Sequence, residues 1–454
     1  MAFKSVNPAN GNTLREVDEF THEQLEAALQ SAAEAGAAWR ASAVGERAAL
    51  MREVAAVVRK HLDEYAEIIT GEMGKPITES RAEIEKCAWV CDYYAQESPG
   101  FLADELIESD ASSSLVAWQP LGTVLAIMPW NFPFWQVFRF AVPALAAGNT
   151  GLLKHASNVP LCALAIESVF REAGFPEGVF RSLMITSSRV ADLIADPRIH
   201  AVTLTGSEPA GRQVAQAAGA SLKKTVLELG GSDPFIVLED ADLELALDNA
   251  VTSRFMNTGQ SCIAAKRFIL VEAIADEFVR RFRGAVEALT LGDPMDENTR
   301  IGPLARIDLR DALHQQVIDS LAAGAVAVTG CNPESGPGAW YQPSILDRVA
   351  AGMPAWSEEL FGPVALVIRA RDEADAVRIA NDSAFGLGGS VWTTDSARGE
   401  RVARQLECGA AFVNGMVKSD PRLPFGGVKH SGYGRELSRL GIREFVNAKT
   451  IWIR

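Results

Sequence analysis

Apolar positions along this chain follow two different spacings. Residues 21–99 have the helical spacing, which begins behind Thr21 and Gln24, a pair that matches a capping box. Over residues 121–231, short apolar runs such as GTVLAIM and AVTLTGS alternate with longer helical stretches. Apolar strands that alternate with helices are typical of a parallel sheet with helices on both faces. This part of the chain is therefore predicted to be α/β.

The alternation starts again near residue 231, with the strand-like run PFIVLED, and continues to AAFVNG. A second parallel-sheet α/β domain is expected there. The stretch SSSLVAWQP breaks the helical pattern, and we expect it to pair with the short final strand TIWIR as a small β element. The predicted domains are 1–101 with 121–230, then 231–430, and the β element 102–120 with 446–454.

The charge balance of the chain indicates which binding partners to exclude. The chain has 43 basic and 58 acidic side chains, a formal net charge of −15, and 48% hydrophobic residues. This balance argues against a nucleic acid or an anionic membrane as partner. Residues 111–138 lack charge, but several prolines interrupt them, so a buried strand and loop are favoured over a membrane helix. The first residues lack the apolar core of a signal peptide, and a cytoplasmic location is expected.

The six cysteines predict neither a disulfide framework nor a metal site, because no CxxC occurs and the six histidines are scattered. Cys87 and Cys91 lie one helical turn apart and are interpreted as packing residues. Cys262 is different, because it lies in the polar segment NTGQSCIAAKR between a helix-like and a strand-like stretch. A reactive thiol needs access and a stabilised thiolate, whereas a structural one is buried and inert. The local sequence leaves both open.

Turns after four predicted strands carry residues suited to chemistry. Asn131 in PWNFP could donate to a developing oxyanion or simply be a turn residue. Lys154 in LLKH is either a hydroxyl or phosphate ligand or a surface lysine. Gly206 and Ser207 precede a helix, where backbone N–H groups suit a pyrophosphate, although GxGxxG is absent. Glu228 in LELGG is a candidate general base with a raised pKa, or else a cap or ion-pair partner. With a nucleophile, this set suggests carbonyl oxidation through a thioester.

The motifs PWNFP, TLTGS, LELGG, NTGQSC, EELFGPV and PFGGVKHSGYGRE, in this order and spacing, resemble the aldehyde dehydrogenase superfamily over essentially the whole chain. The resemblance implies a Rossmann-like cofactor domain, a catalytic domain and a small β oligomerisation element, in a homodimer or homotetramer that acts on a small-molecule aldehyde. It also implies that Cys262 is the nucleophile, that Glu228 is the general base, and that Asn131 forms the oxyanion hole with the Cys262 backbone N–H.

The resemblance further implies NAD or NADP as cofactor. The family usually has proline and glutamate where this chain has His155 and Ser157. A glutamate at 157 would bond the ribose 2′-hydroxyl and repel a 2′-phosphate, so its absence makes NADP acceptable. The residues assigned to the cofactor are Trp130, Lys154, Ser157, Gly206, Ser207, Glu359 and Phe361.

Arg139 suggests the substrate. It lies on the apolar stretch FWQVFRFAV, where a buried charge needs a partner, and a guanidinium can bind a carboxylate bidentately. Arg139 and Ser419 also match carboxylate-binding residues of the succinate semialdehyde dehydrogenases, which implies oxidation of succinate semialdehyde. Arg139→Ala is then expected to impair that substrate while sparing butanal. These enzymes often have a second arginine where this chain has Met256. The candidates to compensate for it are Arg254, Lys418 and Arg422.

Three alternatives remain open from the sequence. The chain could be a non-catalytic structural relative, although Cys262, Glu228, Asn131 and Glu359 are all intact. It could be a dehydrogenase for another aliphatic aldehyde. It could also pass the thioester to coenzyme A, although the intact Glu228 favours hydrolysis.

Overall fold

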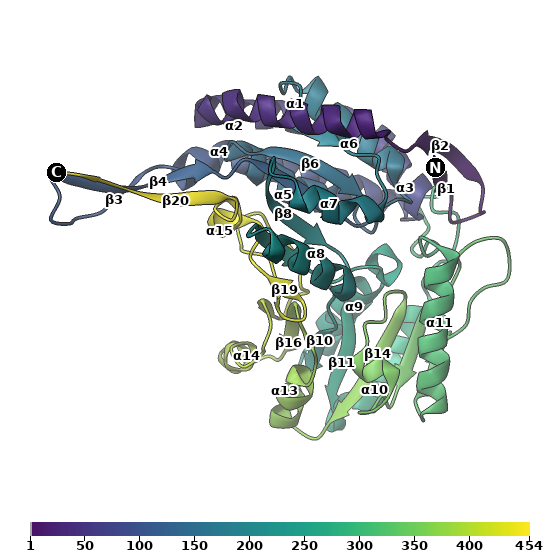
Figure 1. Cartoon of the computed structure of the whole chain (residues 1–454). Helices are drawn as coiled ribbons and strands as arrows, with labels where there is room; N and C mark the ends of the chain where they lie inside the picture. The colour runs from purple at the N-terminus through teal and green to yellow at the C-terminus, as the bar shows by residue number, and fades with distance from the viewer. Residues whose placement is uncertain (1) are drawn as a thin grey trace.

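Two large sheets dominate the computed structural model, which describes residues 2–454 (Figure 1). The first sheet has the order β19-β9-β8-β5-β6-β7, and only β19 runs antiparallel to its neighbour. Its parallel strands arise from the apolar runs of residues 121–230, as predicted. The strands are β5 (Thr123–Met128), β6 (Thr150–His155), β7 (Phe180–Ser182), β8 (Ile199–Thr205), β9 (Lys224–Glu228) and β19 (Gly432–Tyr433).

Helices cover both faces of this sheet, because alternate residues of its strands belong to two separate hydrophobic clusters. Leu125 and Leu152 join the cluster of α1, α7 and α8, whereas Val124 and Leu153 join that of α2, α4, α5 and α6. The capping box of Thr21 and Gln24 begins α1, as predicted. The helices are α1 (His22–Ala41), α2 (Val44–Lys60), α3 (Leu62–Met73), α4 (Ile77–Phe101), α5 (Trp135–Ala146), α6 (Pro160–Glu172), η1 (Ser187–Arg189), α7 (Val190–Ala195) and α8 (Glu208–Ala220).

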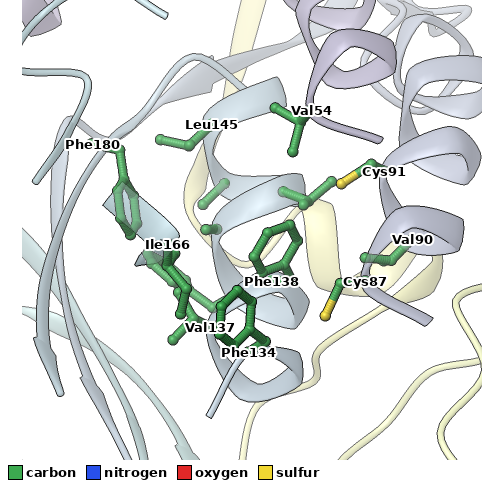
Figure 2. Close-up of a cluster of buried hydrophobic side chains, with 14 of the residues drawn as sticks. Val54, Cys87, Val90, Cys91, Phe134, Val137, Phe138, Leu145, Ile166 and Phe180 are labelled. Carbon is green, nitrogen blue, oxygen red and sulfur yellow. The ribbon is translucent and has the colours of Figure 1, made fainter. Parts of the chain in front are cut away.

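Helix α5 lies in the centre of the largest cluster. Figure 2 shows Phe134, just before α5, and Phe138 of α5 near Cys87 and Cys91 of α4. Both cysteines are fully buried, which agrees with their interpretation as packing residues.

Two glutamates from the N-terminal helices fix the starts of the helices that follow β5 and β6. Glu83 of α4 accepts hydrogen bonds from the N–H groups of Phe134 and Trp135, both at 2.9 Å. Glu72 of α3 accepts from Leu161 N–H at 2.9 Å and Cys162 N–H at 2.8 Å, where α6 begins. Each carboxylate satisfies N–H groups that a helix leaves unpaired at its N-terminus.

The second sheet has the order β12-β13-β14-β11-β10-β16-β17, with only the edge strand β12 antiparallel. All of its strands lie within residues 231–430. Its strands are β10 (Asp233–Val237), β11 (Ala265–Val271), β12 (Val326–Thr329), β13 (Ser344–Asp347), β14 (Val364–Ala370), β16 (Gly388–Trp392) and β17 (Ala410–Val413). The helices in this part of the chain are α9 (Leu243–Phe255), η2 (Met256–Gly259), α10 (Glu272–Glu287), α11 (Ile307–Ala322), α12 (Pro354–Ser357), α13 (Glu373–Asn381) and α14 (Ser396–Ala403).

A third sheet, of order β20-β4-β3, projects from the body as an arm (Figure 1). Strand β20 (Val446–Ile453) pairs antiparallel with β4 (Ser113–Pro120) along its whole length, so the predicted pairing of the final strand is confirmed. Strand β3 (Glu105–Leu106) completes the arm. The remaining elements are the hairpin β1 (Ala2–Val6) and β2 (Thr13–Asp18), the pair β15 (Phe385–Gly386) and β18 (Val428–Lys429), and α15 (Ser438–Ile442). Within residues 2–454, no helix combines the length and apolar character needed to cross a membrane.

Candidate active site

Cys262 follows a turn of unusual backbone conformation. Asn257, Thr258 and Gly259 are left-handed, with φ of 55°, 54° and 70°. This conformation is costly for a β-branched residue such as Thr258 and is held only where the surroundings enforce it. At Gly259 a Cβ atom would lie 2.3 Å from the Gly362 carbonyl oxygen, so no larger side chain fits. The polar segment that precedes Cys262 is therefore a tight turn leading into β11.

Buried hydrogen bonds hold this turn against the PWNFP loop. Asn257 Nδ2 donates to the carbonyl oxygens of Asn131 at 2.7 Å and Gln260 at 3.0 Å. Gln260 Oε1 accepts from Ala305 N–H at 2.9 Å. These bonds tie the cysteine loop to the turn that carries the predicted oxyanion donor.

Asn131 is itself buried. Its Nδ2 donates to the Gln260 carbonyl oxygen at 3.1 Å. An amide nitrogen has two protons, so one proton of Asn131 Nδ2 remains to donate to an oxygen that develops charge.

His155 anchors the same loop. Its Nε2 lies 2.9 Å from the Pro133 carbonyl oxygen, and its Nδ1 lies 2.9 Å from Ala156 N–H. Burial lowers the pKa of His155 to about 4, so the ring is neutral. Nδ1 then accepts from Ala156 while Nε2 donates to Pro133, and the loop around Asn131 is fixed.

Lys266 fixes the backbone of the cysteine loop. This residue was not identified from the sequence. Its Nζ is fully buried and donates to the carbonyl oxygens of Ser261 and Cys262, both at 2.8 Å. It also pairs with Glu359 Oε1 at 3.1 Å, and the same oxygen accepts from Gly231 N–H at 3.0 Å. The available signal was a lysine at the start of an apolar strand, where an unpaired charge is not tolerated.

The Cys262 thiol is protonated at rest. Burial raises the pKa of Cys262 to about 12, although Arg139 and Lys266 favour the thiolate. The nucleophile therefore has to lose its proton as it attacks.

Glu228 ends β9 and is 2% exposed, and neither of its carboxylate oxygens has a hydrogen-bond partner among the described residues. Burial raises the pKa of Glu228 well above its ordinary value, and the neighbouring Glu436 raises it further, against Arg139 and Arg435. The raised pKa expected from the sequence is thus present. A Cβ atom at Gly426 would lie 2.6 Å from Glu228 Oε1, so glycine is needed beside it.

Arg139 already has a partner within the protein. Its Nε forms a buried ion pair with Glu436, and its guanidinium lies 4.4 Å from the centre of the Phe425 ring. The sequence argument that this buried charge needs a partner was correct, but Glu436 meets the need before any substrate binds.

A cavity of about 160 Å³ lies at Cys262. Most of its wall is apolar, and Phe132, Trp135, Met256 and Phe425 contribute to it. Its polar lining includes Glu79, Glu83, Lys86, Arg139, Lys418 and Ser419. Ser419, predicted from the sequence, is thus in the cavity with Arg139, whereas Lys86 was not predicted.

Both arginines that the sequence suggested as compensating residues lie outside this cavity. Arg254 is fully buried and donates to the carbonyl oxygens of Leu360 and Gly362. Arg422 pairs with Asp420 at 2.6 Å on the surface. Lys418 does line the cavity, but its side chain is exposed.

The residues assigned to a dinucleotide occupy a second region. Lys154 lines a cavity of about 140 Å³ together with Leu204 of β8 and Val214 of α8. Gly206 and Ser207 precede α8, and the Ser207 side chain does not cap that helix, so its first N–H groups can receive an anion. Ser157 is exposed after β6.

Trp130 and Phe361, which were also assigned to the cofactor, lie near the cysteine loop. Their rings meet edge to face, with centroids 5.8 Å apart. Lys266 Nζ lies 5.8 Å from the centre of the Phe361 ring. An apolar cavity, an uncapped helix start and an aromatic pair beside the cysteine loop are the features that a dinucleotide requires, so these residues fit one.

The chain is similar to known aldehyde dehydrogenases over essentially its whole length. The sequence profile of the aldehyde dehydrogenase family matches residues 1–451. The chain is 52% identical over 453 residues to the probable NADP+ succinate-semialdehyde dehydrogenase of Synechocystis sp., with 100% of both chains covered. It is 50% identical over 448 residues to the NAD(P)+ succinate semialdehyde dehydrogenase Sad of Escherichia coli, covering 99% of this chain and 97% of that one. The structure of succinic semialdehyde dehydrogenase from Streptococcus pyogenes with NADP+ superposes with a TM-score of 0.98 at 38% identity, covering 100% of both chains.

Proposed function

Because the chain belongs to the aldehyde dehydrogenase family, we propose that it oxidises succinate semialdehyde to succinate with NADP or NAD as oxidant. The observation that carries this proposal is the composition of the cavity at Cys262. Its mostly apolar wall suits a short carbon chain, and Lys86 and the Ser419 hydroxyl suit a carboxylate. An uncharged aldehyde would leave these polar groups without a ligand.

In the proposed reaction, the Cys262 thiol loses its proton to water as its sulfur attacks the aldehyde carbon. The aldehyde oxygen becomes an alkoxide, which the free proton of Asn131 Nδ2 and the Cys262 backbone N–H stabilise. Trp130, Glu359 and Phe361 would hold the nicotinamide, which would supply the oxidising power as the acceptor of a hydride. Lys266 and the turn at Asn257 hold the Cys262 sulfur and the oxyanion donors in fixed relative positions during the reaction.

Glu228 is the proposed base for hydrolysis of the resulting thioester. A carboxylate with a raised pKa can remove a proton from water near neutral pH, which an ordinary glutamate does poorly. The hydroxide adds to the thioester carbonyl, the Cys262 thiolate leaves, and succinate is released. Arg139 and Glu436 set the charge around this base.

The proposed cofactor residues follow the same assignment. Lys154 and the exposed Ser157 would lie at the adenosine ribose, and no carboxylate at 157 would repel a 2′-phosphate. Gly206 and Ser207 would hold the pyrophosphate. Glu359 would bind the nicotinamide ribose, with Trp130 and Phe361 beside the nicotinamide.

Assembly into a homodimer or homotetramer is part of the proposal. The arm formed by β3, β4 and β20 supports it, because Leu106 is 79% exposed and Trp452 50% exposed on this projecting sheet. Strand β20 is also an edge strand, whose unpaired backbone groups favour pairing with another chain. A cytoplasmic location, where nicotinamide cofactors are abundant, belongs to the same proposal.

A substrate panel tests the function. Initial rates are measured with succinate semialdehyde and with butanal, each with NAD and with NADP, in the presence and absence of coenzyme A. We expect succinate semialdehyde to be the better substrate and succinate to be the product whether or not coenzyme A is present. A preference for butanal would refute the substrate, and succinyl-coenzyme A would refute hydrolysis. A lack of turnover with every aldehyde would favour the non-catalytic alternative.

A further inference from the structure

Lys86 is a cavity-lining cation that takes no part in the chemical steps proposed above. It lies on α4, half-buried, one helical turn beyond Glu83 on the same face. Its Nζ donates to Ser419 Oγ at 2.8 Å and lies 4.3 Å from the centre of the Trp135 ring. Lysine and serine thus meet on the wall of the cavity that contains Cys262.

The acidic groups around Lys86 are bound to other partners. Glu83 pairs with Lys75 and also accepts the two N–H groups at the start of α5. Glu79 accepts from the Asn257 N–H at 2.6 Å. Asp420 is held by Arg422. Within residues 2–454, no carboxylate oxygen lies within 4.0 Å of Lys86 Nζ.

The other cations of the cavity are placed differently. Arg139 is paired with Glu436, and Lys418 is exposed, where water screens its charge. Lys86 is therefore the partly desolvated cation whose charge lacks an anion. Burial, and next to it the positive charge of Arg139, lower the pKa of Lys86 to about 8, against the thiol of Cys87 and the carboxylates of Glu83 and Asp420.

We propose that Lys86 Nζ and Ser419 Oγ together bind the carboxylate of the substrate, one to each oxygen. The proposal rests on the proposed oxidation of succinate semialdehyde and names the residues that select it. Lys86 has protons beyond the one donated to Ser419, and the Ser419 hydroxyl keeps its own proton to donate. Arg139 then acts as a positioning residue, because it binds Glu436 and sets the field at Glu228.

Three variants test the assignment. Lys86→Met removes the charge at similar length, Lys86→Arg keeps a charge, and Lys418→Met removes a charge from the exposed side of the same cavity. Loss of a charge-assisted bond should lower kcat/KM for succinate semialdehyde roughly ten- to a hundredfold in Lys86→Met, mostly through KM. Butanal should change by less than about threefold in that variant, and Lys86→Arg should restore part of the loss. Lys418→Met should lose less than Lys86→Met, because its charge is screened.

A pH profile gives a second, independent readout. In the wild type, KM for succinate semialdehyde should rise above about pH 8 as Lys86 loses its proton, whereas KM for butanal should not. In Lys86→Arg the rise should disappear, because arginine stays charged in this range. This comparison needs only a folded, active arginine variant and decides the question even if Lys86→Met does not fold.

Different results would refute the proposed function and the proposed role of Lys86. A wild type that prefers butanal refutes the proposed function itself. A wild type that prefers succinate semialdehyde, with an unchanged preference in Lys86→Met, refutes only the role of Lys86. An unchanged rise of KM with pH in Lys86→Arg refutes it as well. An equal loss with both substrates would show that Lys86 supports the shape of the cavity rather than binding the carboxylate.

Discussion

Replacement of Arg139 by methionine is the perturbation for which sequence and structure give different expectations. From the sequence alone, Arg139 binds the substrate, so its loss should affect succinate semialdehyde and spare butanal. In the structure, Arg139 is 2% exposed and paired with Glu436, and its charge also opposes the raised pKa of Glu228. Its loss leaves Glu436 without its ion-pair partner and removes one of the two cations that favour ionised Glu228.

The magnitude follows from these contacts. Breaking a buried ion pair by removing one partner costs about 3–5 kcal/mol. Two unit charges about 4 Å apart at an effective dielectric constant of about 20 attract each other by about 4 kcal/mol, so loss of Arg139 raises the pKa of the Glu228 and Glu436 carboxyl groups further. A smaller fraction of Glu228 is then ionised, and hydrolysis should slow at least about tenfold for succinate semialdehyde and butanal alike.

The dependence on pH has a definite sign. In Arg139→Met the pKa of Glu228 and Glu436 in the folded state rises further above the unfolded value of 4.5. At these two groups the folded state then binds more protons than the unfolded state, so their contribution to stability is greatest below pH 4.5 and falls as pH rises toward the folded-state pKa. The stability deficit of the variant should therefore be larger at about pH 8 than at about pH 5.

The assays are thermal unfolding at both pH values and steady-state kinetics with both aldehydes. Glu436→Gln alone and the double variant Arg139→Met with Glu436→Gln complete a double-mutant cycle. The double variant should be more stable than Arg139→Met, since it buries neither charge. A variant Arg139→Met with unchanged melting, unchanged butanal turnover and a raised KM for succinate semialdehyde would refute this reasoning and restore Arg139 as a direct substrate ligand.

Three further predictions concern the chemistry, the cofactor and the assembly. Cys262→Ala should abolish turnover. Glu228→Gln should keep a stoichiometric burst of reduced cofactor in stopped flow and lose the steady-state rate. An unchanged steady-state rate in Glu228→Gln would mean that another group activates water. Ser157→Glu should raise KM for NADP roughly tenfold or more over its effect on NAD, and equal effects on both would place residue 157 away from the ribose. Trp452→Asp should lower the mass measured by analytical ultracentrifugation by disrupting the arm, while an unchanged mass would exclude the exposed end of β20 from the interface.

Much of the fold could be read from local patterns. The apolar runs at Thr123–Met128, Thr150–His155 and Ile199–Thr205 became parallel strands because a strand buried on both faces must be apolar throughout. The pairing of the final strand with the excursion at Ser113–Pro120 was also predicted. The hairpin of residues 2–18 was not, because its mostly exposed strands carry little apolar signal.

The site was predictable where a motif marks a turn and unpredictable where a partner is distant. Asn131, Glu228 and Cys262 follow strands or precede them in recognisable segments. Lys86, by contrast, is an ordinary charged residue within a helical pattern, and its partner Ser419 lies 333 residues away. Arg139 was identified from the sequence, but no residue near it in the sequence indicates that Glu436 is its ion-pair partner.

The arm and the β19 strand have a consequence for the order of events during synthesis. Residues 432–453 leave the ribosome after all the segments they complete: β19 covers the edge of β9, β20 pairs with β4, and Glu436 joins Arg139. Until then, the nascent chain exposes the open edge of the first sheet and holds a guanidinium without its carboxylate. A polypeptide released before residue 432 therefore lacks both Glu436, which acts on the pKa of Glu228, and the arm strand β20. Its first sheet keeps an open edge, which chaperones and proteases can recognise.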